Sequence, residues 1–209
     1  MKFSIGKFDT YIFDFDGVIV DSVNIKTEAF AELYRPFGEK VVCSVVAHHI
    51  SHGGLSRFDK ISYYHKNYLN KTISSPELNR LVVKFSGLVF GKVIKAPYVD
   101  GALDFLRLLK SKKKKVFLLS ATPEKEIKKI AKKRRLYNYF LDIKGSPVAK
   151  KDNLRSILQD YKIDVARSVY FGDSNEDLKA ALAVGVTFIP INYFDKRKGE
   201  SNLVKFAKL

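Results

Sequence analysis

A short segment near the amino terminus constrains the fold of this chain more than any other part. In Y-I-F-D-F-D-G-V-I-V-D-S (residues 11–22), an apolar and aromatic run ends in two aspartates and a glycine. β-Branched and aromatic residues stopped by Gly17 predict a buried strand over residues 11–15. Because side chains alternate along a strand, Asp14 and Asp16 are expected on one side of the chain at its end.

Two neighbouring carboxylates at the end of a strand repel each other. Such a pair needs a cation, a shared proton or two different environments to be stable. Hard oxygen ligands beside a phosphate indicate Mg²⁺, and Gly17 lets the backbone turn close to a bound group. The segment alone is also compatible with an acidic turn after a strand, so the decision depends on the rest of the chain.

The composition limits the protein class. The 209 residues suffice for one domain, with or without an insertion, and the 38 basic against 22 acidic residues give a net charge of +16. This charge favours anionic partners, such as phosphates, nucleic acid or a membrane surface. Cys43 is the single cysteine, so no intramolecular disulfide is possible. Without a signal-like or membrane-spanning segment, we expect a soluble, cytoplasmic protein and no membrane partner; the oligomeric state is left open.

Periodicity divides the chain into a helical segment and an alternating one. A helical period follows Ser22, with Asp21 or Ser22 as its N-cap, and residues 39–95 show mixed helical periodicity that is clearest at 77–90. From residue 96 onward, strands and helices alternate, which predicts an α/β doubly wound parallel sheet. The expected strands are 116–120, 140–143, 169–172 and 186–191, and the expected helices are 101–110, 123–135, 152–161 and 175–184.

Three further motifs fall at the ends of predicted strands, where ligands bind in open sheets of this kind. They are L-L-S-A-T-P (118–123) with Ser120, G-S-P-V-A-K-K (145–151) with Lys150 preferred over Lys151, and F-G-D-S-N-E-D (171–177) with Asp173 and Asp177. Taken singly, the serine and the first aspartate are typical helix caps and the lysine is a typical surface charge. Their common position at strand ends argues for one site.

In this order, the four motifs resemble those of the haloacid dehalogenase superfamily, in its phosphatase branch of phosphoglycolate phosphatase and β-phosphoglucomutase-like enzymes. The resemblance implies a Rossmann-like core over 1–21 and 97–209 with an inserted α-helical cap over 22–96. It implies that Asp14 attacks phosphorus and that Asp16 serves as general acid and then as general base, worth ~10²–10⁴-fold in rate. It further implies Mg²⁺ ligands at Asp14, the main-chain carbonyl of Asp16 and Asp173, phosphoryl contacts at Gly17, Ser120, Ala121 and Lys150, and a role for Asp177 in orienting Lys150 or in the outer sphere of the metal.

The cap segment carries a weaker resemblance. H-G-G-L-S-R (52–57) is similar to the G-x-S-R segment of β-phosphoglucomutase-like caps, so Arg57 is expected to hold an anionic or hydroxylated part of the substrate. A surface arginine after a Gly-Gly turn is the alternative. His48, His49 and His52 lie nearby, but without cysteines or matching acids they are expected on helix faces or turns and not at a metal.

The most direct prediction is a Mg²⁺-dependent phosphatase that acts on a small phosphorylated metabolite, such as a sugar phosphate. Asp16 disfavours dehalogenation, because a halide leaving group needs no proton. Lys26 stands where the mutases carry a histidine, which disfavours a phosphosugar mutase and keeps a phosphonate hydrolase with a Schiff-base lysine as an alternative.

A nucleic-acid-binding module is the alternative that is not an enzyme. It would use the basic runs 112–115 and 128–135, but no nucleic-acid-binding motif accompanies them, and no specific nucleic acid is expected.

Overall fold

The computed structural model describes residues 4–195, 200–202 and 206, and its centre is a sheet of five parallel strands. The order β3-β2-β1-β4-β5 puts the first strand of the chain in the middle of the sheet. Each strand pairs in parallel with its neighbour. The bounds are β1 Thr10–Phe13, β2 Lys115–Pro123, β3 Asp142–Ser146, β4 Ser168–Gly172 and β5 Thr187–Pro190.

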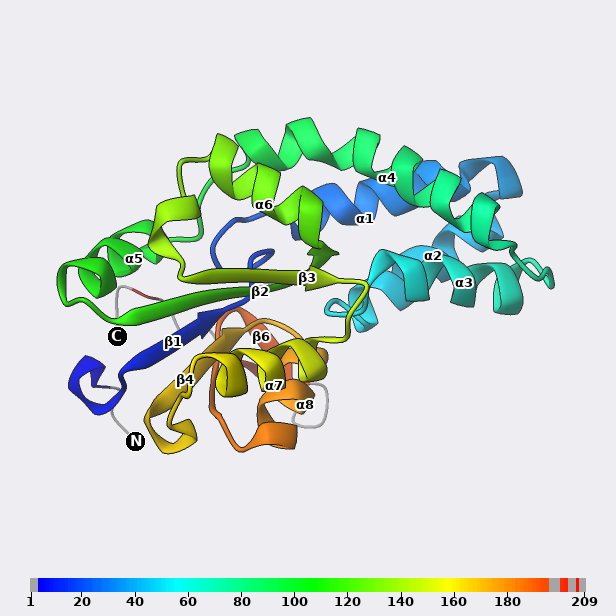
Figure 1. The fold of residues 1–209 in the computed structure, drawn as a ribbon. Coiled ribbons are helices and arrows are strands. Elements are labelled where there is room, and N and C mark those ends of the chain that lie inside the picture. Colours follow the sequence, from blue (N-terminus) through cyan, green and yellow to red (C-terminus); the bar gives the residue numbers. More distant parts are fainter. Residues whose placement is uncertain (1–3, 196–199, 203–205, 207–209) are drawn as a thin grey trace.

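Helices cover both faces of this sheet (Figure 1). Alternate residues of β1 point to opposite faces, so Tyr11 and Phe13 pack with residues of α5 (Ala102–Ser111) and α6 (Glu124–Lys133). Ile12 packs instead with residues of α7 (Lys150–Asp160) and α8 (Asn175–Val184). The predicted class, an α/β doubly wound parallel sheet, is therefore confirmed.

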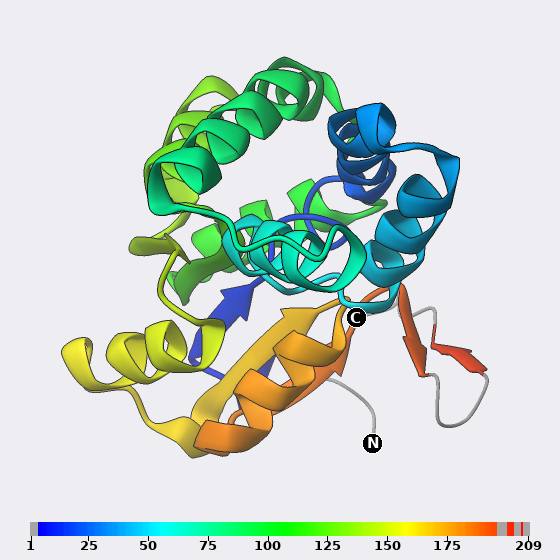
Figure 2. The same ribbon diagram turned by 90° about the vertical axis from the view of Figure 1, so that its right-hand side faces the viewer.

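Four helices fill the segment between β1 and the next strand, namely α1 Val23–Tyr34, α2 Glu39–Ser51, α3 Arg57–Tyr68 and α4 Ser75–Lys95. In Figure 1, α2 and α3 lie beyond the carboxyl ends of the strands, and α4 runs over α6; Figure 2 shows the four helices from their own side. Their apolar faces meet in a core around Phe30, Tyr64 and Phe85. The predicted helical insertion is thus present, as four packed helices.

Two connecting segments, one entering and one leaving the helical segment, lie side by side and join it to the sheet. The main-chain N–H of Asp21 donates to the carbonyl of Pro97 at 3.0 Å, and that of Val99 donates to Ile19 at 3.0 Å. Arg134 of the basic run 128–135 donates to the carbonyls at the end of α4, at Val93, Ile94 and Ala96. These contacts tie the helical segment to the sheet and give Arg134 a structural role.

The structure differs from the prediction in several places. The strand expected at 140–143 runs over Asp142–Ser146, because a 3-10 turn at Tyr137–Tyr139 precedes it and Leu141 is exposed. The short hairpin of β6 (Tyr193–Asp195) and β7 (Glu200–Asn202) was not predicted. Further 3-10 turns are at Ile5–Lys7, Arg35–Phe37 and Val165–Arg167. No helix in the described part of the chain is long and apolar enough to cross a membrane.

Candidate active site

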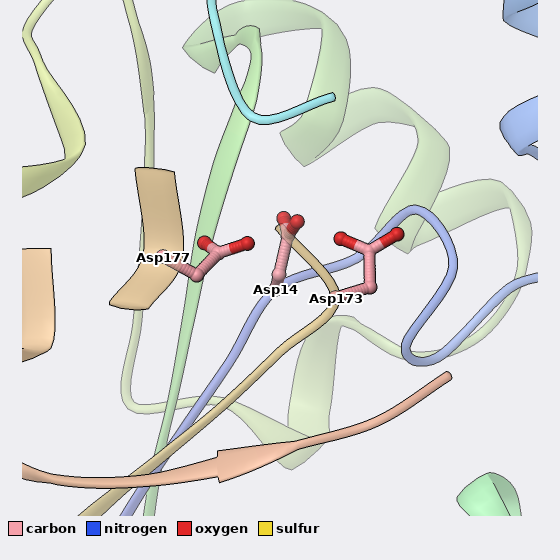
Figure 3. Close-up of side chains that lie close together, drawn as sticks. All are labelled: Asp14, Asp173 and Asp177. Atoms are coloured by element: carbon pink, nitrogen blue, oxygen red, sulfur yellow. The ribbon is translucent and has the colours of Figure 1, made fainter. Parts of the chain in front are cut away.

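Three carboxylates meet at the carboxyl edge of the sheet. Asp14 follows β1, Asp173 follows the neighbouring strand β4, and Asp177 lies in the first turn of α8. The N–H of Asp14 donates to the carbonyl of Phe171 at 2.9 Å, which fixes the two strand ends in register. One oxygen from each carboxylate lies within 4.8 Å of the others, and Figure 3 shows them grouped around Asp14.

Two of the three carboxylates have a raised pKa, chiefly because they are buried. Burial raises the pKa of Asp14 to about 7, although the Lys150 ammonium opposes the shift. Burial and the charge of Asp14 raise the pKa of Asp173 well above its usual range. Asp173 has no hydrogen-bond donor among the residues that the structure describes. A pair of carboxylates with an unsatisfied member is the environment that a divalent cation stabilises.

Asp177 differs from the other two because each of its oxygens has two protein donors, whereas in the described part of the chain each oxygen of Asp14 has one, the Phe15 N–H at 2.7 Å and Lys150. One oxygen accepts from Lys150 Nζ at 2.6 Å and from the Tyr170 hydroxyl. The other accepts from the backbone N–H and hydroxyl of Ser174, in a capping box at the start of α8. Although Asp177 is one of the three clustered carboxylates, it is therefore better suited to positioning Lys150 than to binding a metal.

Lys150 bridges two of the carboxylates. Its Nζ lies 2.9 Å from Asp14 Oδ2 and 2.6 Å from Asp177 Oδ1. Burial opposes its charge, but these carboxylates raise the pKa of Lys150 above its ordinary value. Asn153 secures the preceding turn by donating to the carbonyl of Gly145 at 3.0 Å. Lys150 is thus the buried lysine of its pair, and Lys151 is exposed.

Asp16 has a separate set of partners. Its carboxylate binds the ammonium of Lys26 and accepts from the Ser22 hydroxyl at 2.6 Å. Burial alone would raise the pKa of Asp16, but the Lys26 ammonium lowers it below its ordinary value. Ser22 stands at the N-cap of α1 as predicted, yet its hydroxyl serves Asp16 and not the helix. Lys26 also donates to Thr122 Oγ1 at 2.8 Å, so it connects α1 to β2.

The remaining motif residues lie around these groups. Gly17 has a φ of 80°, and a Cβ there would lie 2.1 Å from an oxygen of Asp173, so only glycine fits. Ser120 is buried, and its hydroxyl accepts from the N–H of Thr122 at 3.1 Å. The next residue, Ala121, lines the cavity described below.

A cavity of about 500 Å³ lies between the strand ends and the helical segment. This volume falls in the range of sites for small molecules, ~300–1,000 Å³. The sheet side contributes Asp14, Asp16, Gly17, Ala121 and Asp173, and the helical side contributes Lys26, Phe30, His49, Arg57, Lys60 and Phe85. Most of the residues predicted from the motifs therefore share one cavity with a set of basic side chains, while Ser120, Lys150 and Asp177 are not among the residues that line it.

Arg57 lines the cavity but is already bound to protein groups. Its guanidinium makes two bonds of 2.9 Å to the carboxylate of Glu126 on α6 and one of 2.7 Å to Ser86 on α4. It also lies 4.6 Å from the centre of the Phe85 ring. These contacts connect α3, α4 and α6. No local sequence pattern indicates Glu126 as a partner, because the two residues are 69 positions apart.

We expect Arg57→Ala to lower the free energy of unfolding by about 3–5 kcal/mol, because it leaves the Glu126 carboxylate without its partner. Glu126→Ala should cost a similar amount, and the double variant should cost less than the sum. Denaturant unfolding measures these values. The exposed pair of Arg35 and Glu32 is the control, where Arg35→Ala should change stability by less than about 1 kcal/mol. Equal losses at the two sites would contradict a buried pair.

The histidines lie on a helix and in a turn, as predicted. The His48 ring stacks on His52 with centroids 4.0 Å apart, and His49 Nδ1 lies 2.8 Å from Lys60 Nζ. The basic run 112–115 contains Lys114, which donates to the carbonyl of Phe8 at 2.7 Å. Sequence reasoning missed Lys60, whose burial depends on the packing of α1, α2 and α3.

Comparisons with known proteins support the motif assignment. Residues 8–185 match the family described as haloacid dehalogenase-like hydrolase. None of the curated protein sequences is similar enough to count as a relative.

Solved structures share the fold at low sequence identity. A β-phosphoglucomutase from Clostridium difficile has a TM-score of 0.79 at 17% identity, over 97% of this chain and 93% of that one. CbbY from Rhodobacter sphaeroides, in complex with xylulose-(1,5)bisphosphate, has 0.72 at 17%, over 96% and 95%. A predicted phosphoglycolate phosphatase from Haemophilus somnus has 0.72 at 14%, over 98% and 97%.

Proposed function

The chain belongs to the haloacid dehalogenase-like hydrolase family, and from this premise we propose that it is a Mg²⁺-dependent phosphatase of small phosphorylated metabolites. The observation that carries the proposal is the contact of Lys150 with Asp14, at 2.9 Å, beside Asp173 and under the cavity. A negative phosphoryl group needs positive charge around it before a carboxylate can attack, and this arrangement supplies both. The related fold of two phosphate-handling enzymes is in keeping with it.

The donor set fits Mg²⁺. Asp14 and Asp173 are close carboxylates, and the oxygens of Asp173 have no protein donor among the described residues. Asp14, the main-chain carbonyl of Asp16 and Asp173 would hold the ion, which would neutralise charge on the phosphoryl oxygens. The side chain of Asp16 stays outside this set because Lys26 and Ser22 bind it.

The residues of the chain then have separate tasks. An oxygen of Asp14 forms a bond to phosphorus while the ester bond breaks, and the leaving alkoxide takes a proton from Asp16. In the second half, Asp16 removes a proton from water, whose oxygen attacks phosphorus and displaces Asp14. The ammonium of Lys26 keeps Asp16 ionised before the substrate binds, so Asp16 must gain a proton before it can protonate the alkoxide. The hydrogen-bonded ammonium of Lys26 would supply this proton, and the proton that Asp16 later removes from water would return to Lys26.

The helical segment would act as a cap over the cavity, with the core at 1–21 and 97–209 and the cap at 22–96. Twelve of the cavity residues come from this segment, so closure would exclude water from the phosphoryl group. Lys26 is paired as an ammonium with the Asp16 carboxylate, and an ammonium has no lone pair with which to form a Schiff base. This arrangement disfavours the phosphonate hydrolase.

We expect the purified protein to release phosphate from at least one member of a panel of phosphorylated metabolites. Removing divalent ions with a chelator should lower the rate at least about a hundredfold, because the ion stabilises transition-state charge by several kcal/mol. Released phosphate is measured with and without added Mg²⁺. A thermal melt in chelator checks that the fold survives. Phosphate release that is indifferent to chelation, or transfer of the phosphate to another position of the substrate without release, would refute the proposal.

A further inference from the structure

Lys60 differs from the other lysine and the arginine that line the cavity, because each of these has a carboxylate partner. Lys26 binds Asp16 and Arg57 binds Glu126, and the nearby Lys150 likewise binds Asp14 and Asp177. Lys60 has none within ion-pair distance among the residues that the structure describes, although its side chain is only 1% exposed. It lies on α3, one turn after Arg57, and lines the cavity.

Neutral groups surround the ammonium of Lys60. Its Nζ lies 2.8 Å from Nδ1 of His49 on α2, 3.4 Å from the carbonyl of Gly53 and 5.6 Å from the centre of the Phe30 ring on α1. Burial and the charge of Lys60 lower the pKa of His49 to about 2, so His49 is neutral and accepts a hydrogen bond at Nδ1. The two contacts leave one of the three ammonium hydrogens for another acceptor.

Such a site is costly for the empty protein. A buried cation without a counter-ion loses hydration that no carboxylate replaces, so burial lowers the pKa of Lys60 to about 7. Lys26 and Lys150 lower it further, while Asp173 and Asp16 act in the opposite direction from the sheet side of the cavity. An anion brought in by a ligand would supply the missing partner.

We propose that Lys60, held by His49 and Gly53, forms a subsite for a second anionic group of the substrate, a carboxylate or a second phosphate. This inference rests on the proposed phosphatase function and names the substrate class for it. The group would lie at the cap end of the cavity, away from the phosphoryl group at Asp14. Arg57 was expected to bind this part of the substrate, but Glu126 and Ser86 already occupy its guanidinium.

The test compares three series of substrates, which are derived from diols with two, three and four carbons. Each series contains the monophosphate, the phosphorylated hydroxy acid of the same length and the bisphosphate. One length of acid or bisphosphate should have a clearly higher kcat/KM than its monophosphate. The ratio of this kcat/KM to that of the monophosphate should fall about 10- to 100-fold in Lys60→Met, as expected for one charged hydrogen bond. Lys66→Met, an exposed lysine of the same helix, is the control and should leave the ratio unchanged.

The pH dependence of the substrate preference is a second measurement, because a lysine with a purely structural role would not affect it. Since the ammonium form binds the anion, the ratio of acid to monophosphate should fall in the wild type as the pH rises above about 7. It should be flat in Lys60→Met or, if that variant does not fold, in Lys60→Gln. Comparing the phosphorylated acids with the bisphosphates shows whether the subsite binds a carboxylate or a phosphate.

The outcomes separate the two proposals. Hydrolysis of the monophosphates without preference for either anionic series would overturn the subsite and leave the phosphatase intact. A preference that survives in the Lys60 variants would also overturn it. Absence of phosphate release from every series, with Mg²⁺ present, would overturn the phosphatase and the subsite with it.

Discussion

Asp14→Asn is expected to reduce phosphate release by at least about 10⁴-fold, the scale seen when a nucleophile is removed from an enzyme that uses one. Asparagine has nearly the same shape but no charge with which to attack phosphorus. Because ionised Asp14 lies among other buried carboxylates, its replacement should not weaken the fold. Activity and stability should therefore respond differently to the same substitution.

Asp14 gives the stability of the metal-free wild-type protein a definite pH dependence. The pKa of Asp14 is about 7 in the folded chain and lower in the unfolded chain, so folding loses stability as the pH rises from about 4 to 7. Asp14→Asn removes this contribution and should melt at an equal or higher temperature at pH 8. Asp104→Asn on α5, at an exposed aspartate, is the control for both the rate of phosphate release and the melting temperature. Substantial turnover by the Asp14 variant would exclude Asp14 as the nucleophile.

The fold was predictable because its signals are local. Alternation of buried strands with amphipathic helices after residue 96 determines a doubly wound sheet, and α8 was predicted with its observed bounds, 175–184. The predicted strand at 140–143 was misplaced because the apolar Phe140 and Leu141 belong to the approach to β3. The helices α2 and α3 could not be delimited, since their polar and apolar residues meet partners from elsewhere in the cap.

The site was predictable to the extent that it depends on strand ends. Parallel strands bring their carboxyl ends to one edge, so Asp14 and Asp173 meet although 159 residues separate them. The other side-chain contacts around the cavity follow no such rule. The contacts of Arg57 with Glu126 and of Lys60 with His49 depend on how helices distant in sequence pack together, which short-range patterns do not encode.

Lys150→Met should lower the free energy of unfolding of the metal-free protein by about 3–5 kcal/mol. The substitution removes the ammonium that lies 2.9 Å from Asp14 and 2.6 Å from Asp177 and leaves both carboxylates buried without it. Lys151→Met is a close control, because its side chain is adjacent in sequence and exposed. It should change stability by less than about 0.5 kcal/mol.

The loss in Lys150→Met should depend on pH and on Mg²⁺ in a way that a simple packing defect would not. Without the ammonium, the already raised pKa of Asp14 rises further, so protonation relieves the repulsion at low pH and the deficit grows toward pH 8. Mg²⁺ at concentrations well above its dissociation constant should restore part of the stability, because it binds the folded carboxylates. Denaturant unfolding at pH 5.5 and pH 8, with and without Mg²⁺, measures all four values. If the loss of stability is the same under all four conditions, Lys150 contributes through packing alone. The electrostatic argument for Asp14 as the attacking group would then be wrong.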